Sequence, residues 1–216
     1  MLTQDQIESA ADRLYKAEVN RIQMPALTLE YPEMDMDDAY KIQECWVKRK
    51  LNEGRQVVGY KIGLTSRAMQ MAVNIDTPDY GVLLDDMVFP NNGSIKASNF
   101  TDPRIETEFA FILKAPLSGE NVSIEDVIAA TDYVVPALEL IAARSFRTDP
   151  ESGYTRKVFD TIADNAANAG IIMGDTQMDP KTIDLPWAGA LLYLNDEIEE
   201  TGLAAGVLGH PALGIS

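Results

Sequence analysis

The sequence has little cysteine, little histidine and few positive charges. Cys45 is the single cysteine among 216 residues, which excludes an intrachain disulfide and a zinc site built from several thiolates. We expect Cys45 to be a buried, inert thiol within a helix. A chain with one cysteine suits a reducing, cytoplasmic setting. His210 is the single histidine, so it is the only imidazole that catalysis or metal binding can draw on.

The charge balance excludes some classes of partner. Lysine and arginine total 18 against 34 aspartates and glutamates, giving a net charge of −16. So acidic a chain is a poor match for nucleic acid or an anionic membrane. An anionic small-molecule substrate would need a local cluster of cations or a bound metal to attract it.

Long hydrophobic runs and linkers are also absent from the sequence. No apolar run approaches bilayer length, and residues 1–5 are polar, unlike a signal peptide. There is no tandem repeat or low-complexity linker. With 46% hydrophobic residues, the chain can bury a substantial core as one domain spanning residues 1–216.

The order of the expected elements predicts the fold class. Amphipathic helices at 3–20 and 37–52 come first, and apolar strands at 57–64, 104–111 and 133–141 follow. Few strands alternate with helices, which favours an α+β fold over a doubly wound sheet. The remaining elements are short helices at 65–71 and 123–130, a turn at 76–81, strands at 82–89 and 191–194, a turn at 195–196, and the lead-in to a helix at 206–211.

Three carboxylates on two apolar strands are candidate metal ligands. Because strand side chains alternate, Glu106 and Glu108 point to the same face, where they repel each other unless a cation lies between them. Glu139 lies in a second apolar strand, where a buried carboxylate must be paired, protonated or bound to metal. Oxygen ligands of this kind suit Mg²⁺ or Mn²⁺. The alternative for Glu106 and Glu108 is a solvated strand face.

Lys61, Asp79 and two arginines have functional and ordinary interpretations. Lys61 interrupts an apolar strand, where its ammonium group needs either a buried partner or access to solvent through its long stem. The sequence slightly favours access to solvent. Asp79 lies in the predicted turn, where function and simple turn chemistry are both common. Arg144 and Arg147 follow a strand, and we expect each to be solvated.

Five segments together resemble a known enzyme family. They are GYKIGLTS at 59–66, PDYG at 78–81, the pair Glu106 and Glu108, ALELI at 137–141 and DNAANAG at 164–170. In this order and spacing they resemble the hydratase/decarboxylase branch of the fumarylacetoacetate hydrolase superfamily, over essentially the whole chain. Within that branch, KVFDT at 157–161 is most similar to hydratases that act on dicarboxylates.

The resemblance implies a fold, a cofactor and a site. The fold would be a mixed β-roll that follows an N-terminal helical region, in a homo-oligomer. Mg²⁺ would bind to Glu106, Glu108 and Glu139, and Lys61 and Asp79 would form a proton-transfer pair. The substrate would be a small 2-oxo dicarboxylate. Its candidate contacts are Arg104 and Arg144, chosen on charge alone, and Asn165.

The implied activity is metal-dependent addition of water to an unsaturated 2-oxo dicarboxylate in aromatic catabolism. A decarboxylase of the 4-oxalocrotonate type would use the same site and is an alternative. Hydrolysis of a carbon–carbon bond is disfavoured, because such enzymes are expected to activate water with a histidine, and His210 lies near the chain end. Family members continue past residues 209–211 through further strands, so a fragment without activity is the third possibility.

Overall fold

The computed structural model describes residues 1–73 and 75–216, which form two compact units. The first unit contains Met1–Gly63, Asp79–Ile105 and Glu139–Ile171. The second contains Leu64–Pro78, Glu106–Leu138 and Ile172–Ser216. Helices come early in the chain and most strands come later, so the predicted α+β class is confirmed.

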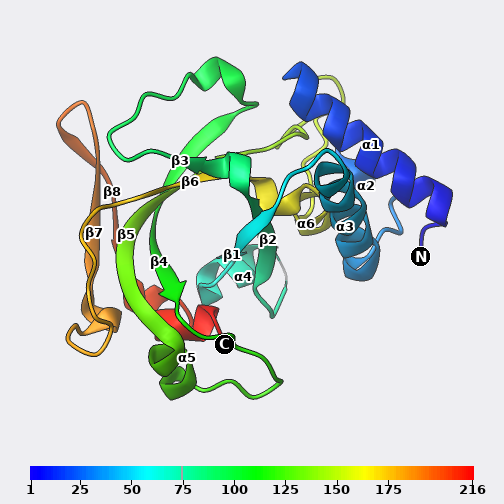
Figure 1. The fold of residues 1–216 in the computed structure, drawn as a ribbon. Helices are drawn as coiled ribbons and strands as arrows, with labels where there is room; N and C mark the ends of the chain where they lie inside the picture. Colours follow the sequence, from blue (N-terminus) through cyan, green and yellow to red (C-terminus); the bar gives the residue numbers. More distant parts are fainter. Residues whose placement is uncertain (74) are drawn as a thin grey trace. The chain divides into compact units, whose positions relative to one another are not determined.

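Two long helices of the first unit pack against each other (Figure 1). Helix α1 (Gln4–Asn20) begins with a capping box on Thr3, and helix α3 (Met36–Asn52) is capped by Asp35. Each buries an apolar stripe at helical spacing. Both helices were predicted from that spacing, to within one residue at each end.

The first unit also contains two short helices and a two-stranded sheet. Helix α2 (Leu27–Glu30) and helix α6 (Val158–Ala163) contact each other, and α6 also packs on α3. Strand β1 (Val57–Gly63) pairs antiparallel with strand β2 (Asp79–Leu84). This small sheet carries the predicted Lys61 and Asp79.

Four further strands form a second sheet. Strands β3 (Val88–Phe89), β6 (Asn168–Met173), β5 (Thr131–Ala142) and β4 (Pro103–Leu113) lie in the order β3-β6-β5-β4 (Figure 1). The strands predicted at 104–111 and 133–141 are therefore confirmed and prove longer. Their adjacency could not be predicted from the sequence, because pairing between distant strands is set by tertiary packing.

The second unit contains two short helices and a hairpin. Helix α4 (Arg67–Val73) follows Ser66, whose hydroxyl accepts a hydrogen bond from the Met69 N–H group. Helix α5 (Ile124–Ala130) has the predicted Ser123 cap. Strands β7 (Gly189–Leu194) and β8 (Glu197–Leu203) pair around the predicted turn. Across both units, the 3₁₀ turns among the described residues are Asp85–Met87, Ala97–Asn99, Asn165–Ala167, Leu185–Trp187, Ala204–Gly206 and Pro211–Gly214.

Two local predictions need correction. The loop expected at 76–81 ends earlier, because Asp79 is already the first residue of β2 and pairs with Gly63. The strand expected at 82–89 is broken by the 3₁₀ turn Asp85–Met87. In the first case the pairing with β1 overrides the turn chemistry of Pro78 and Asp79.

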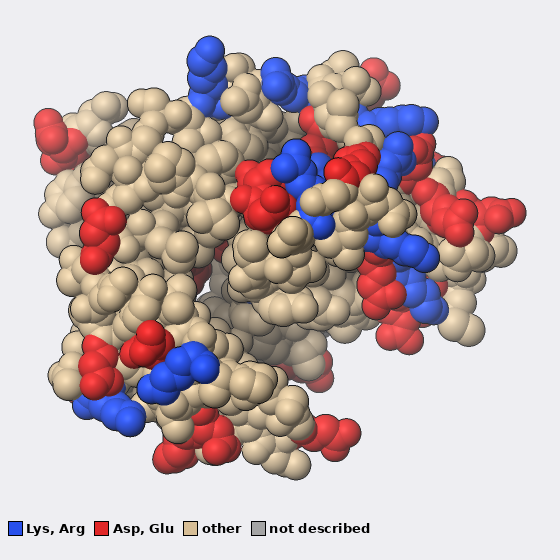
Figure 2. Space-filling model, viewed as in Figure 1, with Lys and Arg blue, Asp and Glu red and all other residues tan. Residues whose placement is uncertain are grey.

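Charged side chains of both signs are interspersed on the face of the first unit that carries α1 and α3 (Figure 2). Asp12, for example, pairs with both Lys16 and Arg49. Such surface pairs stabilise a protein only slightly. Among the described residues, no helix is both long and apolar enough to cross a bilayer.

Candidate functional site

The register of β1 and β2 places Lys61 and Asp79 on one face. Lys61 lies opposite Gly81, and Gly63 lies opposite Asp79. Directly opposed residues in an antiparallel pair share a face, and so do residues two apart along a strand. The two functional side chains are therefore diagonal neighbours, and each faces a glycine.

These glycines provide the space that the two side chains fill. A Cβ atom at Gly63 would lie 2.3 Å from Asp79 Oδ1 and 3.2 Å from Lys61 Nζ. A Cβ atom at Gly81 would lie 3.3 Å from Lys61 Cε and 2.6 Å from the main-chain oxygen of Asn165. Any larger residue at either position would displace the functional groups.

Lys61 is paired within the first unit rather than solvated. Its ammonium lies 3.3 Å from Glu139 Oε1, and the two side chains are 12% and 8% exposed. The expectation that Lys61 reaches solvent was wrong, because its partner lies far away in the sequence. The prediction that Glu139 is buried is confirmed.

Asp79 is a buried acid beside this ion pair. It is 3% exposed, and its Oδ1 atom has no hydrogen-bond partner among the described residues. Burial raises the pKa of Asp79, against the opposing pull of the Lys61 charge. A carboxyl group that keeps its proton to higher pH is suited to exchanging protons with a ligand.

Glu106 and Glu108 lie on one face of β4 and are exposed. Strand β4 neighbours β5, the strand that carries Glu139. Arg104 falls on the same face of β4 by strand alternation, and its exposed guanidinium lies 3.9 Å from Asp102.

Arg144 is buried, which corrects the expectation that it is solvated. Its guanidinium lies 3.2 Å from Asp164 Oδ1 and 4.9 Å from the centroid of the Trp46 ring. Burial raises the pKa of Asp164 to about 6, against the opposing pull of the Arg144 charge. With these partners, Arg144 is better placed to hold the fold together than to contact a substrate.

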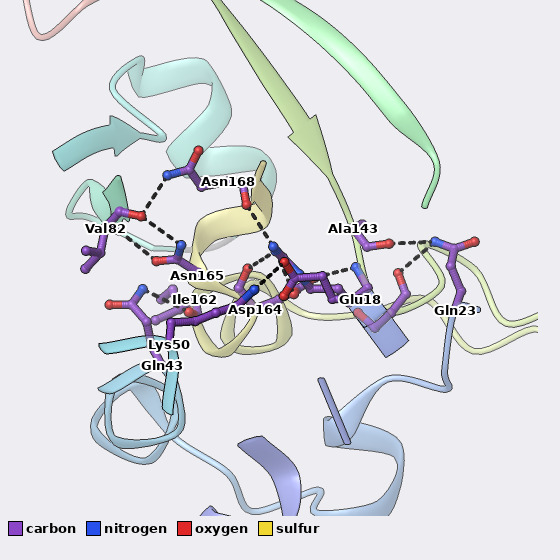
Figure 3. A network of polar contacts seen from close by, with 12 residues as sticks. Glu18, Gln23, Gln43, Lys50, Val82, Ala143, Ile162, Asp164, Asn165 and Asn168 are labelled. Atoms are coloured by element: carbon purple, nitrogen blue, oxygen red, sulfur yellow. Dashed lines mark hydrogen bonds and ion pairs between the residues drawn. The ribbon is translucent and has the colours of Figure 1, made fainter. Parts of the chain in front are cut away.

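Asn165 begins an unusual turn in which three consecutive residues without glycine are left-handed. The φ angles of Asn165, Ala166 and Ala167 are 53°, 52° and 55°. This conformation costs roughly 1–2 kcal/mol for each such residue. The Asn165 amide is fully buried and bonded to both main-chain groups of Val82, at 2.7 and 3.0 Å (Figure 3). These contacts favour a structural role over a substrate contact.

Sequence reasoning missed the roles of Gly63, Gly81 and Gln43. The glycines had a usable signal, since Gly59 and Gly63 flank Lys61 at the period of a strand face. Gln43 had none, because its bond to the Tyr80 carbonyl depends on how α3 packs.

Comparison with known proteins agrees with the motifs. No family model matches the chain. It is 55% identical over 206 residues to 2-oxo-hept-4-ene-1,7-dioate hydratase from Escherichia coli, covering 95% of this chain and 77% of the relative. The chain belongs to the hydratase/decarboxylase branch of the fumarylacetoacetate hydrolase superfamily. Another member, 2-keto-4-pentenoate hydratase from Paraburkholderia xenovorans (strain LB400), is 38% identical over 97% of this chain and 76% of its own length.

A solved member of the branch confirms the fold. The structure of 4-oxalocrotonate decarboxylase from Pseudomonas putida G7, complexed with magnesium and adipate, matches with a TM-score of 0.90 at 35% identity. The match covers 98% of this chain and 78% of that one. The relatives named as hydratases are hydro-lyases, so the predicted enzyme class is confirmed as well.

Proposed function

We propose that the protein is a metal-dependent hydratase that converts 2-oxohept-4-ene-1,7-dioate to 4-hydroxy-2-oxoheptanedioate. The observation that carries this proposal is the buried ion pair of Lys61 and Glu139 beside the buried acid Asp79. It is supported by the similarity to a relative that bears the name of this hydratase.

Glu106, Glu108 and Glu139 are the proposed metal ligands. The donor set consists of carboxylate oxygens alone, which suits a hard divalent ion. We propose Mg²⁺ as the bound ion, since the solved relative is a complex with magnesium, and Mn²⁺ as the alternative. When bound, the ion would polarise the keto oxygen of the substrate as a Lewis acid.

Lys61 and Asp79 move the protons in this proposal. The pair removes a proton from C3 and delivers one to C5, which brings the double bond into conjugation with the keto group. Water then adds at C4, and a proton returns to C3. The raised pKa of Asp79 favours its role as a proton carrier.

Arg104 is the proposed partner of the distal carboxylate. It is exposed and shares a strand face with Glu106 and Glu108. Arg144 and Asn165 are buried and already bonded, so we assign neither to the substrate. The adipate in the solved relative is itself a dicarboxylate.

Loss of the ultraviolet absorbance of 2-hydroxyhepta-2,4-diene-1,7-dioate, the dienol tautomer of the substrate, tests the proposal. We expect turnover with Mg²⁺, none with EDTA, and none for Glu106→Gln. The matched control is Glu199→Gln, which neutralises an exposed glutamate on strand β8 and should turn over like the unaltered protein. Turnover in EDTA, or an active Glu106→Gln variant, would contradict the metal assignment.

Decarboxylation is the second candidate, because the solved neighbour is a decarboxylase. Release of CO₂ from 4-oxalocrotonate, without hydration of the seven-carbon substrate, would favour it.

We further propose that the protein is a cytoplasmic homo-oligomer. Exposed apolar side chains on the β7–β8 hairpin, including Leu191, Tyr193 and Ile198, offer surface for such an assembly. Light scattering after size-exclusion chromatography measures its mass, and a monomer at micromolar concentration would contradict this part.

A further inference from the structure

The outer edge of β2 is bonded by side chains instead of by another strand. In the part of the chain that the structure describes, the one strand that pairs with β2 is β1. On the other edge, Val82 receives hydrogen bonds from Asn165 Nδ2 and Asn168 Nδ2, both 3.0 Å from its carbonyl oxygen. The Val82 N–H group donates to Asn165 Oδ1 at 2.7 Å, and Gln43 Nε2 lies 2.9 Å from the Tyr80 carbonyl oxygen. Figure 3 shows the two asparagines at Val82. Alternate residues of a strand direct their main-chain groups to the same edge, so Tyr80 and Val82 share the outer edge of β2 and three amides bond where a neighbouring strand would.

These amides are buried and are themselves anchored. Gln43 Nε2 also lies 3.1 Å from the Ile162 carbonyl oxygen, which ties helix α3 to α6. Arg144 holds both ends of the left-handed turn, with hydrogen bonds of 3.2 Å to the Asp164 carbonyl oxygen and 3.1 Å to the Asn168 carbonyl oxygen. The three amides therefore link β2 to helices α3 and α6 and to the left-handed turn that Arg144 holds.

The position of β2 determines the geometry of the proton-transfer pair. Asp79 is the first residue of β2, and Gly81, between the two anchored positions, faces Lys61. The main-chain oxygen of Asn165 and the Cε atom of Lys61 both approach the point where a Gly81 Cβ atom would stand. A shift of β2 would thus move Asp79 and reopen the space around Lys61 together.

We propose that Gln43, Asn165 and Asn168 are positioning residues for Lys61 and Asp79. The inference rests on the proposed function, in which that pair carries the protons. Each amide acts through β2 and needs no contact with the substrate. A misplacement of about 1 Å in a catalytic group can cost on the order of a hundredfold in rate.

Gln43→Met gives the sharpest test, because methionine has nearly the same shape and lacks both donors. Its matched control is Thr28→Val, which removes a buried hydroxyl bonded to Asp160 in the same unit, at the contact of α2 with α6. We expect both variants to lose similar stability to urea. Only Gln43→Met should lower kcat, by about tenfold or more, with KM little changed.

Asn165→Asp and Asn165→Ala form a graded pair. Aspartate keeps the acceptor for the Val82 N–H group but sets a carboxylate oxygen against the Val82 carbonyl oxygen in place of the donor, whereas alanine loses both bonds without adding this repulsion. We expect kcat to be lower for Asn165→Asp than for Asn165→Ala. This order of kcat values tests the inference even if the Gln43→Met variant does not fold.

A kcat equal to that of the unaltered protein in a folded Gln43→Met variant would overturn the inference, and so would equal losses of kcat in Gln43→Met and Thr28→Val. If the unaltered protein fails to hydrate the dioate, the proposed function fails instead. In that case, hydrogen exchange of the β2 main-chain amides in metal-free protein tests, independently of activity, whether the side chains anchor β2. Faster exchange in β2 for Gln43→Met than for Thr28→Val supports the anchoring, and equal exchange overturns it.

Discussion

The two small antiparallel sheets have the same architecture and opposite surroundings. The pairs β1–β2 and β7–β8 each contain two strands and one irregularity of register. Strand β2 is buried at all but one position, and buried amides bond its outer edge. Strand β8 is exposed at every position.

The costs of folding differ between these sheets accordingly. In the hairpin β7–β8 the unfavourable feature is the turn, in which Asn195 and Asp196 adopt positive φ angles of 51° and 65°. The pair β1–β2 contains a buried ammonium and a buried acid, both unfavourable to desolvate. Unfavourable groups tend to collect where chemistry occurs, and this difference supports our proposal that β1–β2 is the functional sheet.

Neutralising the proton-transfer pair should have the largest effect. We expect Lys61→Met and Asp79→Asn each to lower the hydration rate by roughly 10²–10⁴-fold, the usual contribution of a general acid or base. Glu197→Gln on β8 should leave the rate unchanged. Steady-state kinetics at saturating Mg²⁺ provide the check, and a fully active Asp79→Asn variant would remove Asp79 from the mechanism.

The next largest difference is expected when a methyl group is added at one glycine of each sheet. In Gly81→Ala the new Cβ atom meets the Asn165 main-chain oxygen at 2.6 Å, whereas at Gly202 in β8 it meets nothing within 4 Å. We expect Gly81→Ala to cost about 1–3 kcal/mol of unfolding free energy and most of the activity. Gly202→Ala should stay within about 1 kcal/mol. Urea unfolding measures both, and equal costs would contradict the packing described around Lys61.

The pH dependence of stability should reveal the buried acid. Because burial raises the folded-state pKa of Asp79 above 3.8, its neutral form stabilises the fold, and that contribution is lost as pH rises through the folded-state pKa. Asp79→Asn should therefore gain stability relative to the unaltered protein as pH rises above 3.8.

Asp126→Asn is the control of opposite sign. Hydrogen bonds from Ser123 lower the folded-state pKa of Asp126, so its ionised form stabilises the fold above 3.8 and loses this effect as pH falls. Asp126→Asn should be destabilising at neutral pH and nearly neutral in acid. Urea unfolding of metal-free protein from about pH 2.5 to 8 compares them, because the Asp126 effect is lost below 3.8 and the Asp79 effect above it. Parallel curves for Asp79→Asn and the unaltered protein would contradict the burial argument.

The smallest effect is expected at the tip of the exposed hairpin. Asn195→Ala should cost about 1–2 kcal/mol because its φ angle is 51°, and Asn195→Gly should cost less, since glycine adopts positive φ readily. Neither variant should change turnover. Thermal unfolding with parallel kinetics checks this, and lost activity in a folded Asn195→Ala variant would show that the hairpin contributes to the site.

Local patterns in the sequence predicted the helices and the strand faces. Periodicity and capping residues located α1, α3 and α5, and alternation put Glu106 and Glu108 on one face. These features depend on neighbours a few residues apart, so a single sequence contains them.

The sequence did not predict the features that depend on distant segments. Lys61 was expected to reach solvent, because no residue close to it in the sequence indicates that Glu139 is its partner. Arg144 was expected at the surface, because its pairing with Asp164 and Trp46 exists only after folding. Asp79 was placed in a loop for the same reason, since its strand exists only through pairing with β1.

The product made from 2-oxohept-4-ene-1,7-dioate labelled with carbon-13 at C4 and C7 tests the central claim most directly. Carbon-13 NMR of a reaction with Mg²⁺ should show C4 as a carbinol carbon and C7 retained as a carboxylate in 4-hydroxy-2-oxoheptanedioate, with Asp79→Asn leaving the substrate unchanged. Label appearing as CO₂, or no conversion by metal-loaded, folded protein, would contradict the hydratase account.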